Sequence, residues 1–83
     1  MPKRIVYSVR DKSYQILLRL KEGGATLQAL YRDCRSRSEI VATFMSILEL
    51  CSVGSIHISR AGDDYALEFA GGDVDEIMEK IIE

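Results

Sequence analysis

Hydrophobic and polar positions follow a helical spacing in the first half of the chain. Apolar residues recur every three or four positions after Ser8, Thr26 and Ser36. Each of these three residues is a good N-cap, so the pattern predicts three helices that begin next to them. Gly23 and Gly54 are typical of helix ends, and they predict where the first and third helices stop. The "RSR" turn separates the second helix from the third.

Two stretches after the third helix alternate instead, as strands do. Ile56 and Ile58 share one face of the first stretch. Three apolar residues share one face of the second stretch: Tyr65, Leu67 and Phe69. The intervening "AGDD" contains Gly62, which suits a tight turn, so these two strands are predicted to form a β-hairpin.

The two ends of the chain add one short element each. Residues 4–7, "RIVY", predict a short strand, and Asp73 caps a last amphipathic helix. The apolar stripe of that helix consists of Val74, Ile77, Met78, Ile81 and Ile82. A strand, three helices and a hairpin in this order predict an α+β winged helix: a three-helix helix-turn-helix core closed by a small antiparallel sheet. Residues 1–83 are predicted to be one domain, with 69–83 as a C-terminal extension.

Composition narrows the class of protein. The chain has 83 residues, 47% hydrophobic and 29% charged, which is typical of one small globular domain. It contains no apolar run of about 20 residues and no apolar signal-peptide core at its start, so we expect a cytoplasmic protein. Cys34 and Cys51 lack metal-ligand spacing, and we expect two buried thiols. No nucleophile–base or metal-binding pattern stands out, so we expect a non-enzyme without metal or cofactor.

The third helix decides between two functions. On a helical wheel of about 100° per residue, an apolar arc predicts the buried side, with Met45 at its margin. This arc consists of Ile40, Val41, Phe44, Ile47, Leu48 and Cys51. The opposite arc consists of Glu39, Ala42, Thr43, Ser46, Glu49 and Leu50. That outer arc lacks the Arg, Lys, Asn and Gln that read bases, and it leaves Leu50 as an exposed apolar contact.

The stretch "SRSEIVATFMSILELCSVGSIHI" resembles the C-terminal winged helix of kleisins, in particular the segregation and condensation protein A family. That family has a Ser/Arg-Glu start, a "vatFlalLEL" helix, a glycine and a strand. The positions that match are Glu39, Val41, Ala42, Thr43, Phe44, Leu48, Glu49, Leu50 and Gly54. The first helix matches through Val9, Lys12 and Leu20, so the resemblance covers residues 5 to 60.

The resemblance implies a docking role. A kleisin's C-terminal winged helix binds the ATPase head of an SMC protein during chromosome condensation and segregation. The family's N-terminal domain and the central segment that binds accessory winged-helix subunits have no counterpart in these 83 residues. Both an excised domain and a shortened family member stay open. The wing's ending and the last helix depart from the family's pattern. The resemblance assigns the docking helix residues Phe44, Leu48 and Leu50, with the hairpin strand 56–60 nearby.

The sequence therefore predicts a protein-docking domain. Its expected partner contacts are Phe44, Met45, Leu48, Leu50, Ile56, Ile58 and Arg60. They would cover about 800 Å² per partner, the usual size of a stable interface. Charged residues would form the rim: Glu39, Glu49 and Arg60.

Two other interpretations stay open. A DNA-binding winged-helix regulator would use three arginines at the turn before the third helix as phosphate contacts: Arg32, Arg35 and Arg37. A net charge of −2 and a pI near 5.4 oppose it, since nucleic-acid binders usually carry a basic surplus. Self-association through the last helix is the third interpretation.

Overall fold

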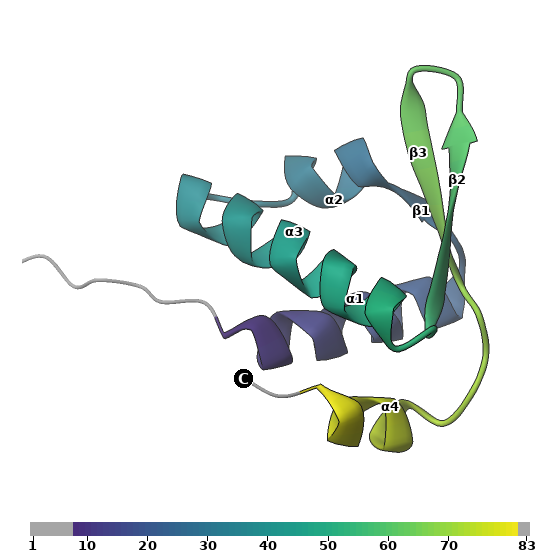
Figure 1. Cartoon of the computed structure of the whole chain (residues 1–83). Helices are drawn as coiled ribbons and strands as arrows, with labels where there is room; N and C mark the ends of the chain where they lie inside the picture. Colours follow the sequence, from purple (N-terminus) through teal and green to yellow (C-terminus); the bar gives the residue numbers. More distant parts are fainter. Residues whose placement is uncertain (1–7, 82–83) are drawn as a thin grey trace, which may run out of the picture.

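The computed structural model describes residues 8–81, which form a small α+β domain of four helices and a three-stranded antiparallel sheet (Figure 1). The elements are, in order, α1 (Val9–Glu22), β1 (Ala25–Thr26), α2 (Leu27–Arg32), α3 (Arg37–Ser52), β2 (Ile56–Ala61), β3 (Asp64–Phe69) and α4 (Val74–Lys80). The predicted α+β class is confirmed. The strand predicted at 4–7 and the last stripe residue, Ile82, lie outside the described residues.

The three predicted N-caps are confirmed by their hydrogen bonds. The side-chain oxygens of Ser8, Thr26 and Ser36 each accept a backbone N–H three residues further on, at 3.1 Å. Each bond satisfies one of the N–H groups that a helix start leaves without a partner, which contributes about 1 kcal/mol per cap. Local chemistry thus fixes where these helices begin.

The sheet contains the predicted hairpin and one strand that the sequence did not reveal. β3 is central, with β2 on one side and the two-residue β1 on the other. Gly62 in the hairpin turn has a φ of 65°, which favours glycine. β1 was missed because two residues are too few to show an alternating pattern. Those two residues, Ala25 and Thr26, also precede a helix that Thr26 caps.

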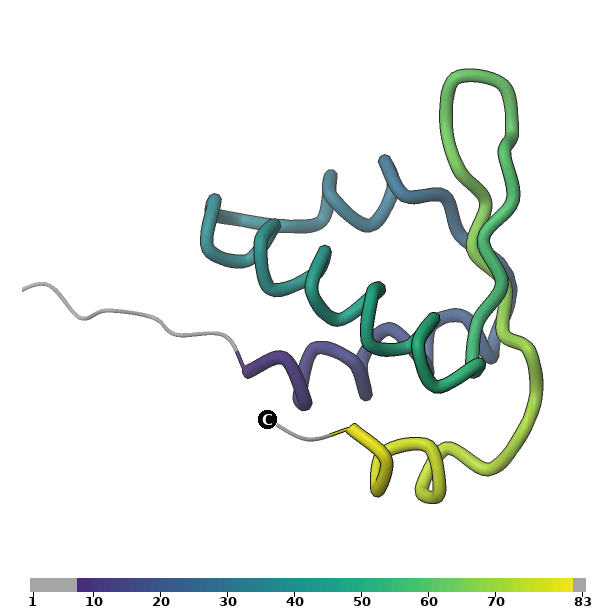
Figure 2. The backbone as a smooth tube through the Cα atoms, viewed as in Figure 1, coloured from purple at the N-terminus to yellow at the C-terminus, as the bar shows by residue number. Residues whose placement is uncertain are grey.

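The last helix, α4, packs with its apolar face against the rest of the domain. α1 lies between α3 and α4, and the chain returns from the sheet so that α4 runs beneath α1 (Figures 1 and 2). The Arg10 guanidinium on α1 donates from Nη1 to two backbone carbonyl oxygens at the end of α4, those of Met78 at 2.6 Å and Ile81 at 2.8 Å. Four stripe residues are buried in the core: Val74, Ile77, Met78 and Ile81. The described part of the stripe that suggested self-association is therefore covered by the same chain.

The orientation predicted for α3 is wrong. The structure buries Leu50 completely and exposes Phe44 and Leu48, the reverse of the wheel assignment. The buried residues of α3 are Ala42, Thr43, Ser46, Ile47 and Leu50. The exposed apolar residues are Ile40, Val41, Phe44, Met45 and Leu48.

Close packing of α3 against α1 explains this orientation. Ser46 Oγ donates toward two backbone carbonyl oxygens, that of Val9 on α1 at 3.0 Å and that of Ala42 at 2.7 Å. Only small side chains fit where one helix comes so near the backbone of another. The small residues therefore face α1, and the large apolar residues of the opposite arc are left outside, except Ile47, which is buried as predicted. A wheel based on hydrophobicity alone does not include this steric requirement.

Candidate functional site

The outward side of α3 carries a row of large apolar side chains that the other described elements leave about half exposed. About half of each side chain is exposed: Val41 50%, Phe44 49%, Met45 49% and Leu48 53%. They stand at helical spacing, so they form one continuous stripe, which we name the α3 apolar face. Single exposed apolar residues are ordinary on protein surfaces, but a contiguous patch on a small domain marks an interaction site.

The hairpin extends this surface. Ile58 on β2 and Tyr65 on β3 are both exposed and turn toward α3. Between the helix and the hairpin lies a groove of about 180 Å³, which we name the apolar groove. Its lining residues are Leu27, Phe44, Ile47, Leu48, Ile58, Tyr65 and Leu67. Figure 1 shows α3 and the hairpin enclosing the angle in which this groove lies.

Five of the seven predicted partner contacts are exposed, and two are not. Phe44, Met45, Leu48 and Ile58 belong to the α3 apolar face or the apolar groove, and Arg60 is exposed near the hairpin turn. Leu50 and Ile56 were predicted wrongly as contacts, because both lie in the core. Leu50 near the end of α3 and Ile56 at the start of β2 belong to the same core cluster as Leu17 and Leu67.

Sequence reasoning missed two members of this surface. Val41 was assigned to the core by its hydrophobicity, and Tyr65 was assigned only to a strand face. No sequence signal separates Val41 from its buried neighbours, because the kleisin-like pattern contains the exposed Val41 and Phe44 together with the buried Thr43. Tyr65 shows no such signal, because its position depends on how the hairpin meets α3.

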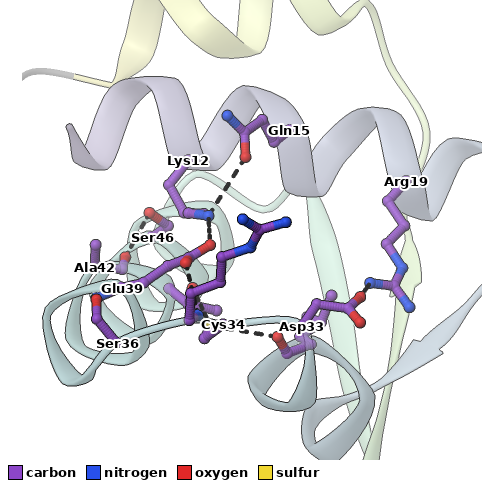
Figure 3. A network of polar contacts seen from close by, with 12 residues as sticks. Lys12, Gln15, Arg19, Asp33, Cys34, Ser36, Glu39, Ala42 and Ser46 are labelled. Atoms are coloured by element: carbon purple, nitrogen blue, oxygen red, sulfur yellow. Dashed lines mark hydrogen bonds and ion pairs between the residues drawn. The ribbon is translucent and has the colours of Figure 1, made fainter. Parts of the chain in front are cut away.

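The basic turn before α3 is exposed, and each of the two carboxylates beside it forms an ion pair with α1 (Figure 3). Asp33 forms an ion pair with Arg19 on α1. Glu39 accepts from Lys12 Nζ on α1 at 2.7 Å and from the backbone N–H of Arg35 at 2.9 Å. The structure leaves all three candidate phosphate contacts exposed: Arg32, Arg35 and Arg37. At the α3 N-terminus Ser36 Oγ accepts the N–H of Glu39, and the Glu39 carboxylate accepts the N–H of Arg35 just before the helix.

The Lys12–Glu39 ion pair fixes α3 on α1. Its side chains are only 11% and 13% exposed, and Lys12 also lies 3.4 Å from Gln15 Oε1. A pocket of about 190 Å³ beside the pair is lined in part by Cys34, whose thiol donates to the Leu30 carbonyl oxygen at 3.4 Å. The pair is a structural contact, because its two charges satisfy each other across two helices.

Both cysteines are free thiols, and they are half-buried where buried thiols were predicted. Burial raises the pKa of the Cys51 thiol above its ordinary value, which disfavours the reactive thiolate. Among residues 8–81, no three His, Cys, Asp or Glu side chains gather in a way that could hold a metal ion. No described helix has the length and apolar character to cross a membrane.

Comparisons with protein-family models, with curated proteins and with solved structures found no match to this chain. The surface must therefore be interpreted from its own residues. Its defining feature is the α3 apolar face joined to the apolar groove.

Proposed function

We propose that the chain is a winged-helix protein-interaction domain that binds a partner protein through the α3 apolar face and the apolar groove. One observation carries this proposal: α3 exposes Phe44, Met45 and Leu48 where a DNA-reading helix presents polar side chains. Burying half-exposed side chains of this size against a partner contributes favourable free energy through the hydrophobic effect. A surface that faces only water would gain nothing by exposing these large apolar side chains side by side.

The surface has the composition of a protein interface. Aromatic, Leu and Met side chains stand at its centre, and Arg60 lies at its edge. Interfaces typically enclose such an apolar centre in a polar rim, and a few central residues supply most of the affinity. We expect Phe44, Leu48 and Tyr65 to be those residues, since all three line the apolar groove.

The partner suggested by the sequence is the ATPase head of an SMC protein. The kleisin-like pattern assigns docking to Phe44, Leu48 and Leu50. Leu50 is buried here, but Phe44 and Leu48 are about half exposed, so pattern and fold agree on these two. This agreement supports the proposal, because the assignment comes from sequence and the exposure from the fold. Under this proposal the chain acts in chromosome condensation and segregation, by holding a head domain and without a catalytic step.

A pair of matched variants tests the docking face. Leu48→Asp introduces a charge into the α3 apolar face, and Leu18→Asp introduces the same charge at a 42%-exposed leucine of α1 outside it. In a calorimetric titration with the SMC head from the same source, we expect Leu48→Asp to weaken binding at least about tenfold. Leu18→Asp should bind like the unchanged chain. Equal affinities for all three chains, or no binding by any, would refute the proposal.

A DNA-binding regulator is the second candidate, and the exposed basic turn favours it. Three arginines stand close together in sequence there, and all three are exposed. Phosphate contacts by these arginines would make duplex affinity fall steeply with salt. Arg35→Ala would then reduce both the affinity and the salt slope. We expect no salt-sensitive duplex binding at physiological salt, because the hairpin turn carries Asp63 and Asp64.

A further inference from the structure

β2 is an edge strand with one side unpaired among the described residues. The sheet order is β1-β3-β2, so β2 pairs with β3 alone. Every residue of β2 after Ile56 is exposed. An edge strand presents a row of backbone N–H and C=O groups that can pair with another strand.

The register identifies which backbone groups of β2 point outward. In an antiparallel ladder, alternate residues bond to the partner strand and the residues between them face away. Ser55 accepts a hydrogen bond from the N–H of Ala70 at 2.8 Å, just before the paired region. By this alternation, the backbone N–H and C=O groups of His57, Ser59 and Ala61 point toward β3 and bond to it. The outward groups belong to Ile56, Ile58 and Arg60.

This edge lacks the usual protection against strand pairing. Its register with β3 runs one-to-one from Ile56↔Phe69 to Ala61↔Asp64, without a bulge. The strand "IHISRA" contains neither proline nor lysine, and Arg60 is its one charge at neutral pH. Natural edge strands usually carry several such features because they prevent unwanted pairing. Their absence leaves the edge open to an extended segment.

The open edge and the apolar groove share one residue, Ile58. Ile58 directs its N–H and C=O outward along the edge, and its side chain lines the groove with Phe44 and Leu48. A strand laid along β2 would place its alternate side chains on the same face as Ile58. One segment can therefore satisfy the backbone groups and fill the groove together.

We propose that the partner binds as an extended segment that pairs with the β2 edge and becomes a fourth strand. This inference rests on the proposed function and specifies the form of the partner. The segment carries apolar side chains at alternate positions toward the groove and an acidic residue opposite Arg60. A helix laid on α3 alone would leave the backbone groups of Ile58 and Arg60 unused. Strand addition supplies affinity from main-chain bonds and specificity from the alternate side chains.

Amide hydrogen exchange of the full chain, free and bound to the SMC head, tests this arrangement. In the free chain we expect the N–H groups of Ile58 and Arg60 to exchange rapidly, and those of His57 and Ser59 to be protected. Addition of the head should slow exchange at Ile58 and Arg60 at least about tenfold. Binding with both amides still exchanging rapidly overturns strand pairing and leaves docking on α3 intact. Failure of the head to bind overturns the proposed function, and this inference with it.

A proline variant provides an independent measurement. Arg60→Pro removes an N–H that β3 does not use, and proline is tolerated at such edge positions. Arg60→Ala removes the same charge and keeps the N–H. We expect Arg60→Pro to bind the head at least about fivefold more weakly than Arg60→Ala at unchanged thermal midpoint. Equal affinities contradict the proposal. Slow exchange at Ile58 in a free chain that sediments as a dimer would also overturn it, since a second copy would then occupy the edge.

Discussion

Leu48 and Leu50 stand two residues apart on α3 and differ completely in burial. Leu50 is 0% exposed among the core residues, whereas Leu48 is 53% exposed on the α3 apolar face. The same substitution, Leu→Ala, removes the same atoms at both positions. Any difference in the free energy of unfolding therefore reports which side of α3 faces the core.

The expected magnitudes are well separated. Leu50→Ala removes a fully buried side chain and leaves a cavity, which costs about 2–5 kcal/mol. Leu48 keeps about half of its surface in water, so Leu48→Ala should cost roughly 1 kcal/mol or less. A domain of this size is stable by roughly 4–12 kcal/mol, so Leu50→Ala removes a large share of the total. Its thermal midpoint should fall by about 8 °C or more.

Urea unfolding of the unchanged chain and the two variants, followed by circular dichroism, measures these differences. The fold predicts a large loss for Leu50→Ala and a small one for Leu48→Ala, with similar slopes against urea. A larger loss for Leu48→Ala would refute the orientation of α3 and with it the docking surface. Equal losses would mean that both leucines are buried to the same extent, which also contradicts the structure.

Three further changes test contacts away from the docking surface. Arg10→Ala removes two hydrogen bonds to the end of α4, so unfolding should cost about 1–2 kcal/mol less and amides of α4 should exchange faster. Lys12→Met leaves the Glu39 carboxylate without its ion pair, and the loss of about 1–3 kcal/mol in urea unfolding should be partly recovered by adding Glu39→Gln. Burial raises the pKa of Cys51, so the unfolded thiol ionises first and the free energy of unfolding falls as the pH rises above about 8.5. Cys51→Ala should make that fall shallower in urea titrations from neutral to alkaline pH.

Features with local causes were predicted well from the sequence. The caps at Ser8, Thr26 and Ser36 each depend on a side chain and a backbone N–H three residues away. The hairpin depends on alternation and on a glycine in the turn, and both are confirmed. The stripe of α4 was likewise confirmed for its residues up to Ile81.

Features that depend on contacts distant in sequence were not predictable in this way. The orientation of α3 depends on Ser46 lying against the α1 backbone, 37 residues away. Hydrophobicity assigned Leu48 inward and Leu50 outward, and the steric fit between the helices reversed both. The apolar groove depends in addition on the angle between α3 and the hairpin, so its member Tyr65 left no recognisable pattern.

The central claim is that the α3 apolar face and the apolar groove bind a protein, and methyl resonances observe those side chains directly. The measurement is a nuclear magnetic resonance titration of the methyl-labelled chain with the SMC head from the same source. We predict that the methyl signals of Leu48, Ile58 and Met45 shift or broaden, while that of Leu18 on α1 stays unchanged. Unchanged signals at Leu48 and Ile58 would contradict the account, whether the head binds elsewhere or does not bind at all.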